Sequence, residues 1–173
     1  MKPLLLALLF LLPVTGTFAQ TAAKNDPPYK KYPTLPAFPI VLPDSSAAIN
    51  TYDIPEGHTT VLLLFSPDCH HCRDMVPKLL QKVDSFPQVR FYLITLMGLQ
   101  SLRDFIQEFN VLSHENVLAG KDPNHFFPGF YKISYIPHAV IYDRHKKLVE
   151  VVDGNFDAEV LLDVVRKSEA KKK

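Results

Sequence analysis

Two cysteines enclosing two histidines are the residues of this sequence best suited to chemistry: Cys69, His70, His71 and Cys72. They follow the apolar run 60–65, which predicts a buried strand, and they open the amphipathic segment 69–84, which predicts a helix. Unpaired N–H groups and the positive dipole end of a first helical turn stabilise a thiolate at Cys69. Cysteines at this spacing can also close a disulfide. The motif therefore predicts a redox-active Cys69–Cys72 pair.

The two histidines are the candidates for tuning this pair. Imidazolium groups at His70 and His71 would favour the thiolate form of a neighbouring cysteine. The alternative for each is a solvated residue at a helix start without an electrostatic role. For the cysteines, the alternative is an inert buried pair.

Composition narrows the class of protein. The chain has 173 residues, enough for one domain, with 19 Lys and Arg against 18 Asp and Glu. This balance argues against a broad basic surface, so we expect no nucleic-acid partner. Two cysteines exclude a disulfide-dense scaffold and a four-cysteine zinc site. No apolar run reaches the roughly 18 residues of a membrane span.

The chain begins with the features of an export signal. Lys2 precedes an apolar run at 4–12, and Thr17-Phe18-Ala19 resembles a cleavage site. We expect a signal peptide at 1–19 and hence an exported protein, with an uncleaved anchor as the alternative. Residues 20–36 are predicted to form a Pro-rich extended lead-in, and residues 168–173 a frayed Lys-rich tail.

Between these ends, strand and helix patterns alternate. Together they predict one α/β domain over 37–167: a three-layer sandwich with a mixed central sheet and an N-terminal β-hairpin. An arrangement of Ser101 and Asp104 like that of a capping box marks the start of the second helix. The expected strands are 38–42, 47–52, 60–65, 90–97, 117–119, 139–143 and 147–152, and the expected helices 69–84, 101–110, 124–131 and 158–167.

Two segments resemble the thioredoxin superfamily. One is Phe65-Ser-Pro-Asp-Cys-His-His-Cys72, with Pro77 five residues beyond it; the other is Tyr131-Lys-Ile-Ser-Tyr-Ile-Pro137, followed by two strands and a last helix. The leader, the hairpin and the segment 111–123 resemble most the TlpA/ResA-type thiol–disulfide oxidoreductases of the bacterial cell envelope. The resemblance implies a location in the bacterial periplasm or cell envelope.

The resemblance implies a role for each matching residue. Cys69 would be the nucleophile, Cys72 would resolve the mixed disulfide, and Pro137 would form a cis peptide facing them. The backbone of Ile136 would bind an extended substrate segment. The implied partners are proteins with thiols or disulfides and a membrane or periplasmic redox partner. No cofactor other than the redox-active disulfide is implied.

Three departures from the family leave the direction of electron flow open. Asp68 replaces the usual Trp, while Leu63 and Met75 occupy the positions of the carboxylic acids that usually accept the proton. His71 stands where DsbA-type oxidants have the histidine of C-P-H-C. Our working expectation is a reductant.

Two other functions remain open from the sequence. One is a copper or other metal chaperone, with Cys69, Cys72 and His138 as ligands and His70 or His71 in reach. Otherwise His138 would be a strand histidine pointing to solvent. The other is an interaction domain that keeps the cysteine pair as a structural bridge.

Overall fold

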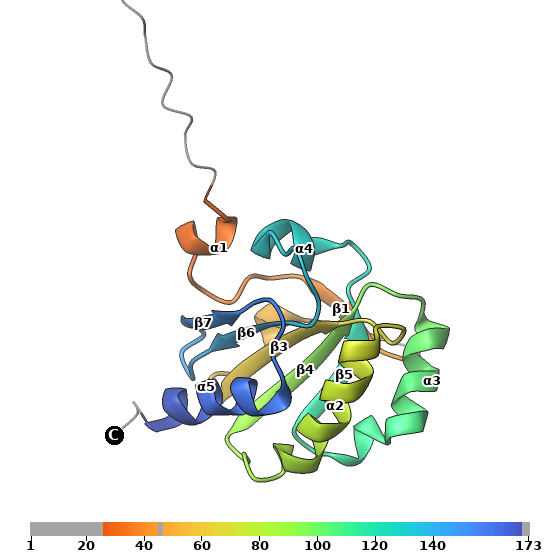
Figure 1. Ribbon diagram of the computed structural model, residues 1–173. Helices are drawn as coiled ribbons and strands as arrows, with labels where there is room; N and C mark the ends of the chain where they lie inside the picture. The colour runs from red at the N-terminus through yellow and green to blue at the C-terminus, as the bar shows by residue number, and fades with distance from the viewer. Residues whose placement is uncertain (1–25, 45–46, 171–173) are drawn as a thin grey trace, which may run out of the picture.

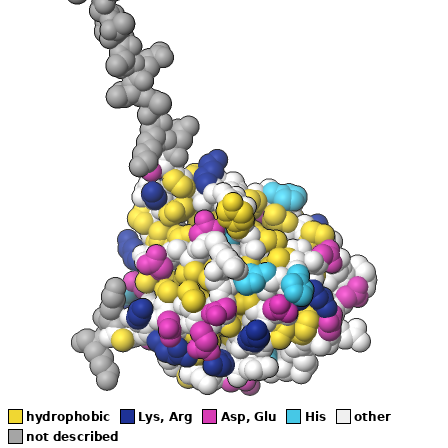
Figure 2. All heavy atoms as spheres, viewed as in Figure 1, with side chains coloured by type: hydrophobic (Ala, Val, Ile, Leu, Met, Phe, Trp, Pro, Cys, Tyr) yellow, Lys and Arg dark blue, Asp and Glu magenta, His cyan; other side chains and the backbone are white. Residues whose placement is uncertain are grey.

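The computed structural model describes residues 26–44 and 47–170 (Figure 1). The predicted signal peptide, the first part of the predicted lead-in and the last three lysines lie outside these residues. Within the described ranges, no helix has both the length and the apolar character needed to cross a membrane. Figure 2 shows acidic and basic side chains interspersed on the face in view, consistent with the near balance of charges in the sequence.

A seven-stranded mixed sheet runs through the middle of the fold, in the order β2-β1-β5-β4-β3-β6-β7. Its three central strands β3, β4 and β5 are parallel, and β6 and β7 continue the sheet antiparallel to β3 and to each other. The predicted N-terminal hairpin, β1 and β2, joins the other side through β5. The bounds are β1 Pro39–Val41, β2 Ala48–Asn50, β3 Thr59–Phe65, β4 Val89–Thr95, β5 Val117–Lys121, β6 His138–Tyr142 and β7 Leu148–Val152.

Strand β3 is apolar without alternation because both of its faces are covered. All seven of its residues are buried. Val61, Leu63 and Phe65 point into one buried cluster, whereas Leu62 and Leu64 point into another on the opposite face. The predicted three-layer sandwich is confirmed, with one apolar cluster on each side of the sheet.

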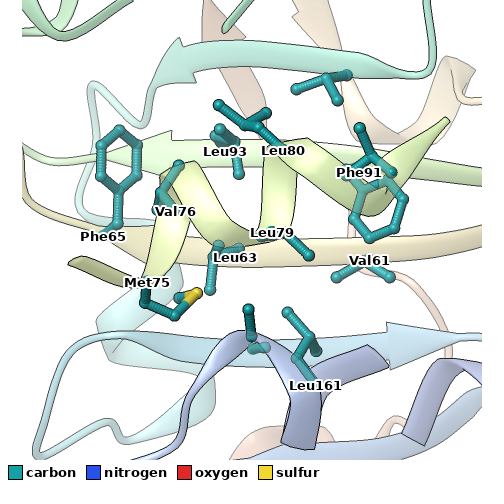
Figure 3. Packing of buried hydrophobic residues seen from close by; sticks show 14 of the residues in the cluster. Val61, Leu63, Phe65, Met75, Val76, Leu79, Leu80, Phe91, Leu93 and Leu161 are labelled. Atoms are coloured by element: carbon teal, nitrogen blue, oxygen red, sulfur yellow. The ribbon is translucent and has the colours of Figure 1, made fainter. Parts of the chain in front are cut away.

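Three helices cover the first face and two short helices cover the second (Figure 1). The Met75, Val76 and Leu79 side chains of α2 lie against β3 and β4, as Figure 3 shows. On the second face, Phe127 and Tyr131 are buried beneath α4. The first face carries α2 His70–Val83, α3 Leu99–Phe109 and α5 Ala158–Ala170; the second carries α1 Pro28–Lys31 and α4 Phe126–Tyr131.

The expectation of an extended lead-in over 20–36 was wrong at residues 28–31. Residues 28–31 form α1, with a proline at the first helical position, where its missing N–H is not needed. The Tyr29 ring packs against Tyr131 of α4, with centroids 5.8 Å apart. Beyond α1, Thr34 pairs with Lys147 beside β7. Packing against α4 and the sheet edge therefore orders a Pro-rich segment that is polar in sequence.

Several element boundaries were also wrong, including the end of β4 at Thr95 instead of 97 and the start of α4 at Phe126 instead of 124. Helix α3 begins at Leu99 with Gly98 as its N-cap and no capping side chain, so the Ser101 and Asp104 capping box does not exist. The expected strand 47–52 ends at Asn50 because Thr51 turns inward, where its hydroxyl accepts from Phe38 N–H at 2.9 Å. Helix α5 extends to Ala170, beyond the expected domain end at 167, because Ser168 is buried.

Candidate active site

Cys69 caps the amino end of α2. Strand β3 ends at Phe65, and the Cys69 N–H donates to the Ser66 carbonyl at 3.1 Å across the tight loop that follows. The Cys69 Sγ in turn accepts from the Cys72 backbone N–H at 3.5 Å. This N–H belongs to the first helical turn and has no partner within the helix. The sulfur therefore lies where a helix best stabilises negative charge.

The two cysteines differ strongly in environment. Both are free thiols in this structure; Cys69 is partly exposed and Cys72 is fully buried. Burial is the largest cause that raises the pKa of the Cys72 thiol to about 12, and the hydrogen bond and the negative charge of Cys69 act in the same direction. The site thus has one accessible sulfur and, one helical turn further on, one protonated sulfur held in the core.

The departures from the family pattern leave an apolar environment around Cys72. Leu63 of β3 and Met75 of α2 are both buried in the same cluster as Cys72 (Figure 3). Neither can accept a proton. Any proton that leaves Cys72 must therefore pass to a group other than these two residues.

The structure places the two motif histidines differently. The His71 Nε2–H donates to the Phe156 carbonyl at 2.9 Å, which ties the first turn of α2 to the loop before α5. The His70 side chain is 93% exposed, and its Nε2 lies 3.4 Å from an Asp74 carboxylate oxygen. Charge on such an exposed ring is screened by water. The geometry favours His71 over His70 as a residue that orders the site; thiolate tuning by either one stays a prediction.

The Ile136–Pro137 peptide bond is cis, as the resemblance implied. Pro137 is buried directly before β6, whose first residue pairs with Leu64 near the end of β3. The loop that leads to Cys69 begins at this same end of β3. Ile136 is 37% exposed and Tyr135 is 69% exposed. Two exposed residues of the chain thus lie at the sheet end that carries the cysteine pair.

Comparison with known proteins supports this arrangement at the level of the fold. A secreted Mycobacterium tuberculosis disulfide oxidoreductase homologous to E. coli DsbE is similar to this chain with a TM-score of 0.63 and 20% identity, over 75% of this chain and 95% of that one. A thioredoxin-family thiol:disulfide interchange protein from Chlorobium tepidum has a TM-score of 0.62 and 17% identity, over 78% and 94%. The fold is thioredoxin-like.

Two further findings complete the comparison. Arabidopsis thaliana ScoI, solved with copper bound, is similar to this chain with a TM-score of 0.60 and 15% identity, over 79% of this chain and 98% of that one. No protein-family model matches the sequence, and a search of the curated proteins found no match. At these identities the likeness extends to the fold alone.

The thioredoxin-like sheet separates the ligands of the hypothetical metal site. Successive residues of β6 alternate between faces: Ala139 lies in the cluster that contains Cys72, whereas Val140 lies in the opposite cluster. His138 shares the face of Val140, and its ring centroid lies 6.1 Å from that of Phe127. Within residues 26–44 and 47–170, no three His, Cys, Asp or Glu side chains are placed to hold a metal ion. The predicted cluster of Cys69, Cys72 and His138 is not assembled.

The expectation that His138 points to solvent was wrong as well. Its side chain is 2% exposed, and its Nδ1–H donates to Asp153 Oδ1 at 3.1 Å. Burial lowers the pKa of His138, although the contacts with Asp153 oppose this shift. The buried ring is therefore neutral at pH 7.

Sequence reasoning missed the loop between β7 and α5. Asp153 binds His138 from one side of this loop, and the Phe156 carbonyl binds His71 from the other. The loop thus connects the first turn of α2 with the residue after the cis-proline. Gly154, which has a φ of 87°, was the available clue, but it predicts only a turn.

Proposed function

We propose that this protein is an exported thiol–disulfide oxidoreductase that resembles the TlpA/ResA type and acts as a reductant. One observation carries the proposal: a partly exposed Cys69 sulfur accepts a helix N–H, one turn before a buried, protonated Cys72. A reactive sulfur must be accessible and able to ionise, and a resolving sulfur must be protected until the first has reacted. The described environments meet both requirements.

The reaction follows from these two environments. The Cys69 thiolate attacks one sulfur of a substrate disulfide; the Cys69–substrate bond forms, the substrate S–S bond breaks, and the leaving sulfur takes up a proton. Cys69 then carries no negative charge, which removes one cause of the raised pKa of Cys72. Cys72 gives up its proton and attacks Cys69 Sγ; the Cys69–Cys72 disulfide forms, the Cys69–substrate bond breaks, and the second substrate sulfur leaves and takes up a proton. Two electrons pass to the substrate.

Substrate would bind along the cis-proline loop. Ile136, which is exposed next to the cis Pro137, would offer its backbone to an extended segment that adds as one strand. The partners would be proteins with thiols or disulfides, together with a periplasmic or membrane protein that reduces the pair again.

The environment of Cys69 supports the reducing direction. A strong oxidant depends on a greatly stabilised thiolate. Of the described residues, only Cys72 donates a hydrogen bond to Cys69 Sγ, and His71 is engaged by a carbonyl. We therefore expect an equilibrium potential against glutathione near the thioredoxin value of about −270 mV or below. A value near about −120 mV would reverse the assignment to an oxidant.

The test of the function is disulfide turnover with matched cysteine variants. Wild-type protein should reduce the disulfides of insulin in the presence of a dithiol reductant, and Cys69→Ser should abolish this. Cys72→Ser should stop turnover after one step and accumulate a mixed disulfide on Cys69, visible by mass spectrometry. A Cys69–Cys72 bridge that resists reductants, and whose loss only lowers thermal stability, would contradict the proposal and favour a structural bridge.

Export is tested separately. The predicted leader supports it, and one structural neighbour is described as secreted. In a bacterial host we expect periplasmic protein whose first residue is Gln20. Cytoplasmic protein that retains Met1 would contradict this part of the proposal.

A further inference from the structure

The residue directly before Cys69 carries an exposed carboxylate. Asp68 lies in the loop between β3 and α2, where its backbone N–H donates to Ser66 Oγ at 3.3 Å. Its side chain has no hydrogen-bond or ion-pair partner among the described residues. Because adjacent Cα atoms are about 3.8 Å apart, this carboxylate lies within roughly 10 Å of Cys69 Sγ.

Neighbouring charges on α2 are already engaged. The Arg73 guanidinium donates to the Pro67 carbonyl at 3.2 Å, pairs with Glu108, and lies 5.2 Å from the centroid of the Phe109 ring. The exposed His70 lies beside Asp74. Neither group neutralises Asp68.

Other charged side chains lie at this end of the sheet, among them Lys121 at the end of β5. Asp153 is about half exposed, and its partner His138 is a buried imidazole whose pKa is lowered by burial, so it supplies no compensating cation. Lys132 is the exposed cation of the loop before Pro137, but it follows α4, which covers the face of the sheet opposite α2. A sulfur that approaches Cys69 from solvent therefore comes within about 10 Å of a carboxylate, that of Asp68, which no described side chain pairs.

We infer that Asp68 is a specificity-determining residue of the redox site, which favours thiols and disulfides with a positive charge beside the reacting sulfur. The corresponding protein substrate is an extended segment with Lys or Arg next to its cysteine. This inference rests on the proposed function, since it concerns what Cys69 exchanges with. At a distance of about 8 Å in water, one unit charge changes the rate of reaction with a singly charged group by about twofold at low ionic strength. Salt reduces the effect because the screening length falls from about 8 Å at 0.15 M to about 3 Å at 1 M.

Charged small thiols provide the test. The protein is first oxidised with diamide to the Cys69–Cys72 disulfide. A thiolate RS⁻ attacks Cys69 Sγ, the S–S bond breaks, and Cys72 leaves and takes up a proton. A second RS⁻ attacks the RS sulfur of the mixed disulfide, forms RSSR and frees Cys69. The probes differ in the group they carry besides the reacting thiolate: an ammonium in cysteamine, a neutral hydroxyl in 2-mercaptoethanol and a carboxylate in 3-mercaptopropionate.

The readout is each variant's rate divided by the wild-type rate for the same thiol, so the intrinsic reactivity of the thiol cancels. Because the thiolate charge is common to the three probes, the effects are compared with that on 2-mercaptoethanol: relative to it, we expect Asp68→Asn to slow cysteamine about twofold and to speed 3-mercaptopropionate about twofold. Asp68→Lys should extend the change in the same direction. Glu115→Gln is the matched control, because it removes an exposed charge at the opposite end of the sheet, just before β5.

Two results would overturn the inference, and they can be told apart. A cysteamine to 3-mercaptopropionate ratio that is the same in wild type, Asp68→Asn and Asp68→Lys refutes the role of Asp68 and leaves thiol–disulfide exchange intact. Failure of diamide to produce any Cys69–Cys72 disulfide refutes the proposed function and this inference together. Loss of the charge preference in 1 M NaCl, with Glu115→Gln behaving as wild type, supports the electrostatic origin.

Discussion

The protected state of Cys72 makes a quantitative prediction about its reactivity. Its pKa is raised from an ordinary value of 9.0 to about 12, with burial as the main cause. Three units correspond to a roughly thousandfold smaller thiolate fraction, which at pH 8 is about 1 part in 10,000. Because only the thiolate is alkylated, folded protein should react with iodoacetamide at Cys72 at least a thousandfold more slowly than unfolded protein.

Single-cysteine variants provide the assay. Cys69→Ser leaves Cys72 as the only thiol, and Cys72→Ser leaves Cys69; each is alkylated at pH 8 with and without guanidinium and quantified by mass spectrometry. Without Cys69, the smaller contributions to the raised pKa disappear but burial remains. We therefore expect Cys72 to stay at least a hundredfold protected, while the partly exposed Cys69 reacts readily in the folded state. Cys72 alkylation in folded Cys69→Ser within tenfold of the unfolded rate would refute the reasoning.

Three further predictions concern stability and titration. Raising the pH from 8 to 10 should lower the free energy of unfolding by about 1 kcal/mol through Cys72. The reason is that the thiol ionises near pH 9 in the unfolded protein but keeps its proton up to about pH 12 in the folded protein. In denaturant titrations at these pH values, Cys72→Ala should not show this loss of stability. Asp153→Asn should lower the pKa of His138 further, since the carboxylate raises it, and should steepen the loss of stability as the pH falls below 6.5; an unchanged NMR titration of the ring would contradict this. Gly120→Ala should destabilise by about 1–3 kcal/mol because the new Cβ would lie 2.3 Å from Ile40 Cγ2 and 2.8 Å from the Val41 carbonyl oxygen. Gly129→Ala is its control, because a Cβ added there has no neighbouring atom within 4 Å. Equal melting temperatures for the two variants would contradict the prediction and show that β1 can shift away from the new Cβ.

The cysteine motif and its supporting elements could be predicted because local spacing specifies them. Three local patterns depend only on neighbours in sequence: the apolar run of β3, the spacing of Cys69 and Cys72, and the 3.6-residue period of α2. The structure has the strand and the helix where they were expected, with the cysteines at the start of the helix. The cis-proline was anticipated only through the family resemblance, because the sequence around Pro137 is compatible with either isomer.

Errors arose where long-range packing overrides a local pattern. The lead-in is Pro-rich and polar, yet α1 is held by Tyr29 on Tyr131 and by the edge of β7. Ser168 belongs to a tail that looks solvated, but its turn of α5 lies against the core. In both cases the ordering contacts come from residues more than 100 positions away in the chain, to which a reading of local composition has no access.

By itself, the sequence determined which atoms can react: one pair of sulfurs at a helix start, with an aspartate before it and no acid at the two positions where the family usually has one. Only the tertiary structure decided which side of the sheet each group occupies. It buried Cys72 among apolar side chains, turned His138 to the opposite face, and tied His71 to the Phe156 carbonyl. The physical reason is that reactivity depends on side-chain chemistry and on spacing over a few residues. The burial of a side chain, the face of the sheet on which it lies and its hydrogen-bond partner depend instead on strand register and on contacts between distant segments.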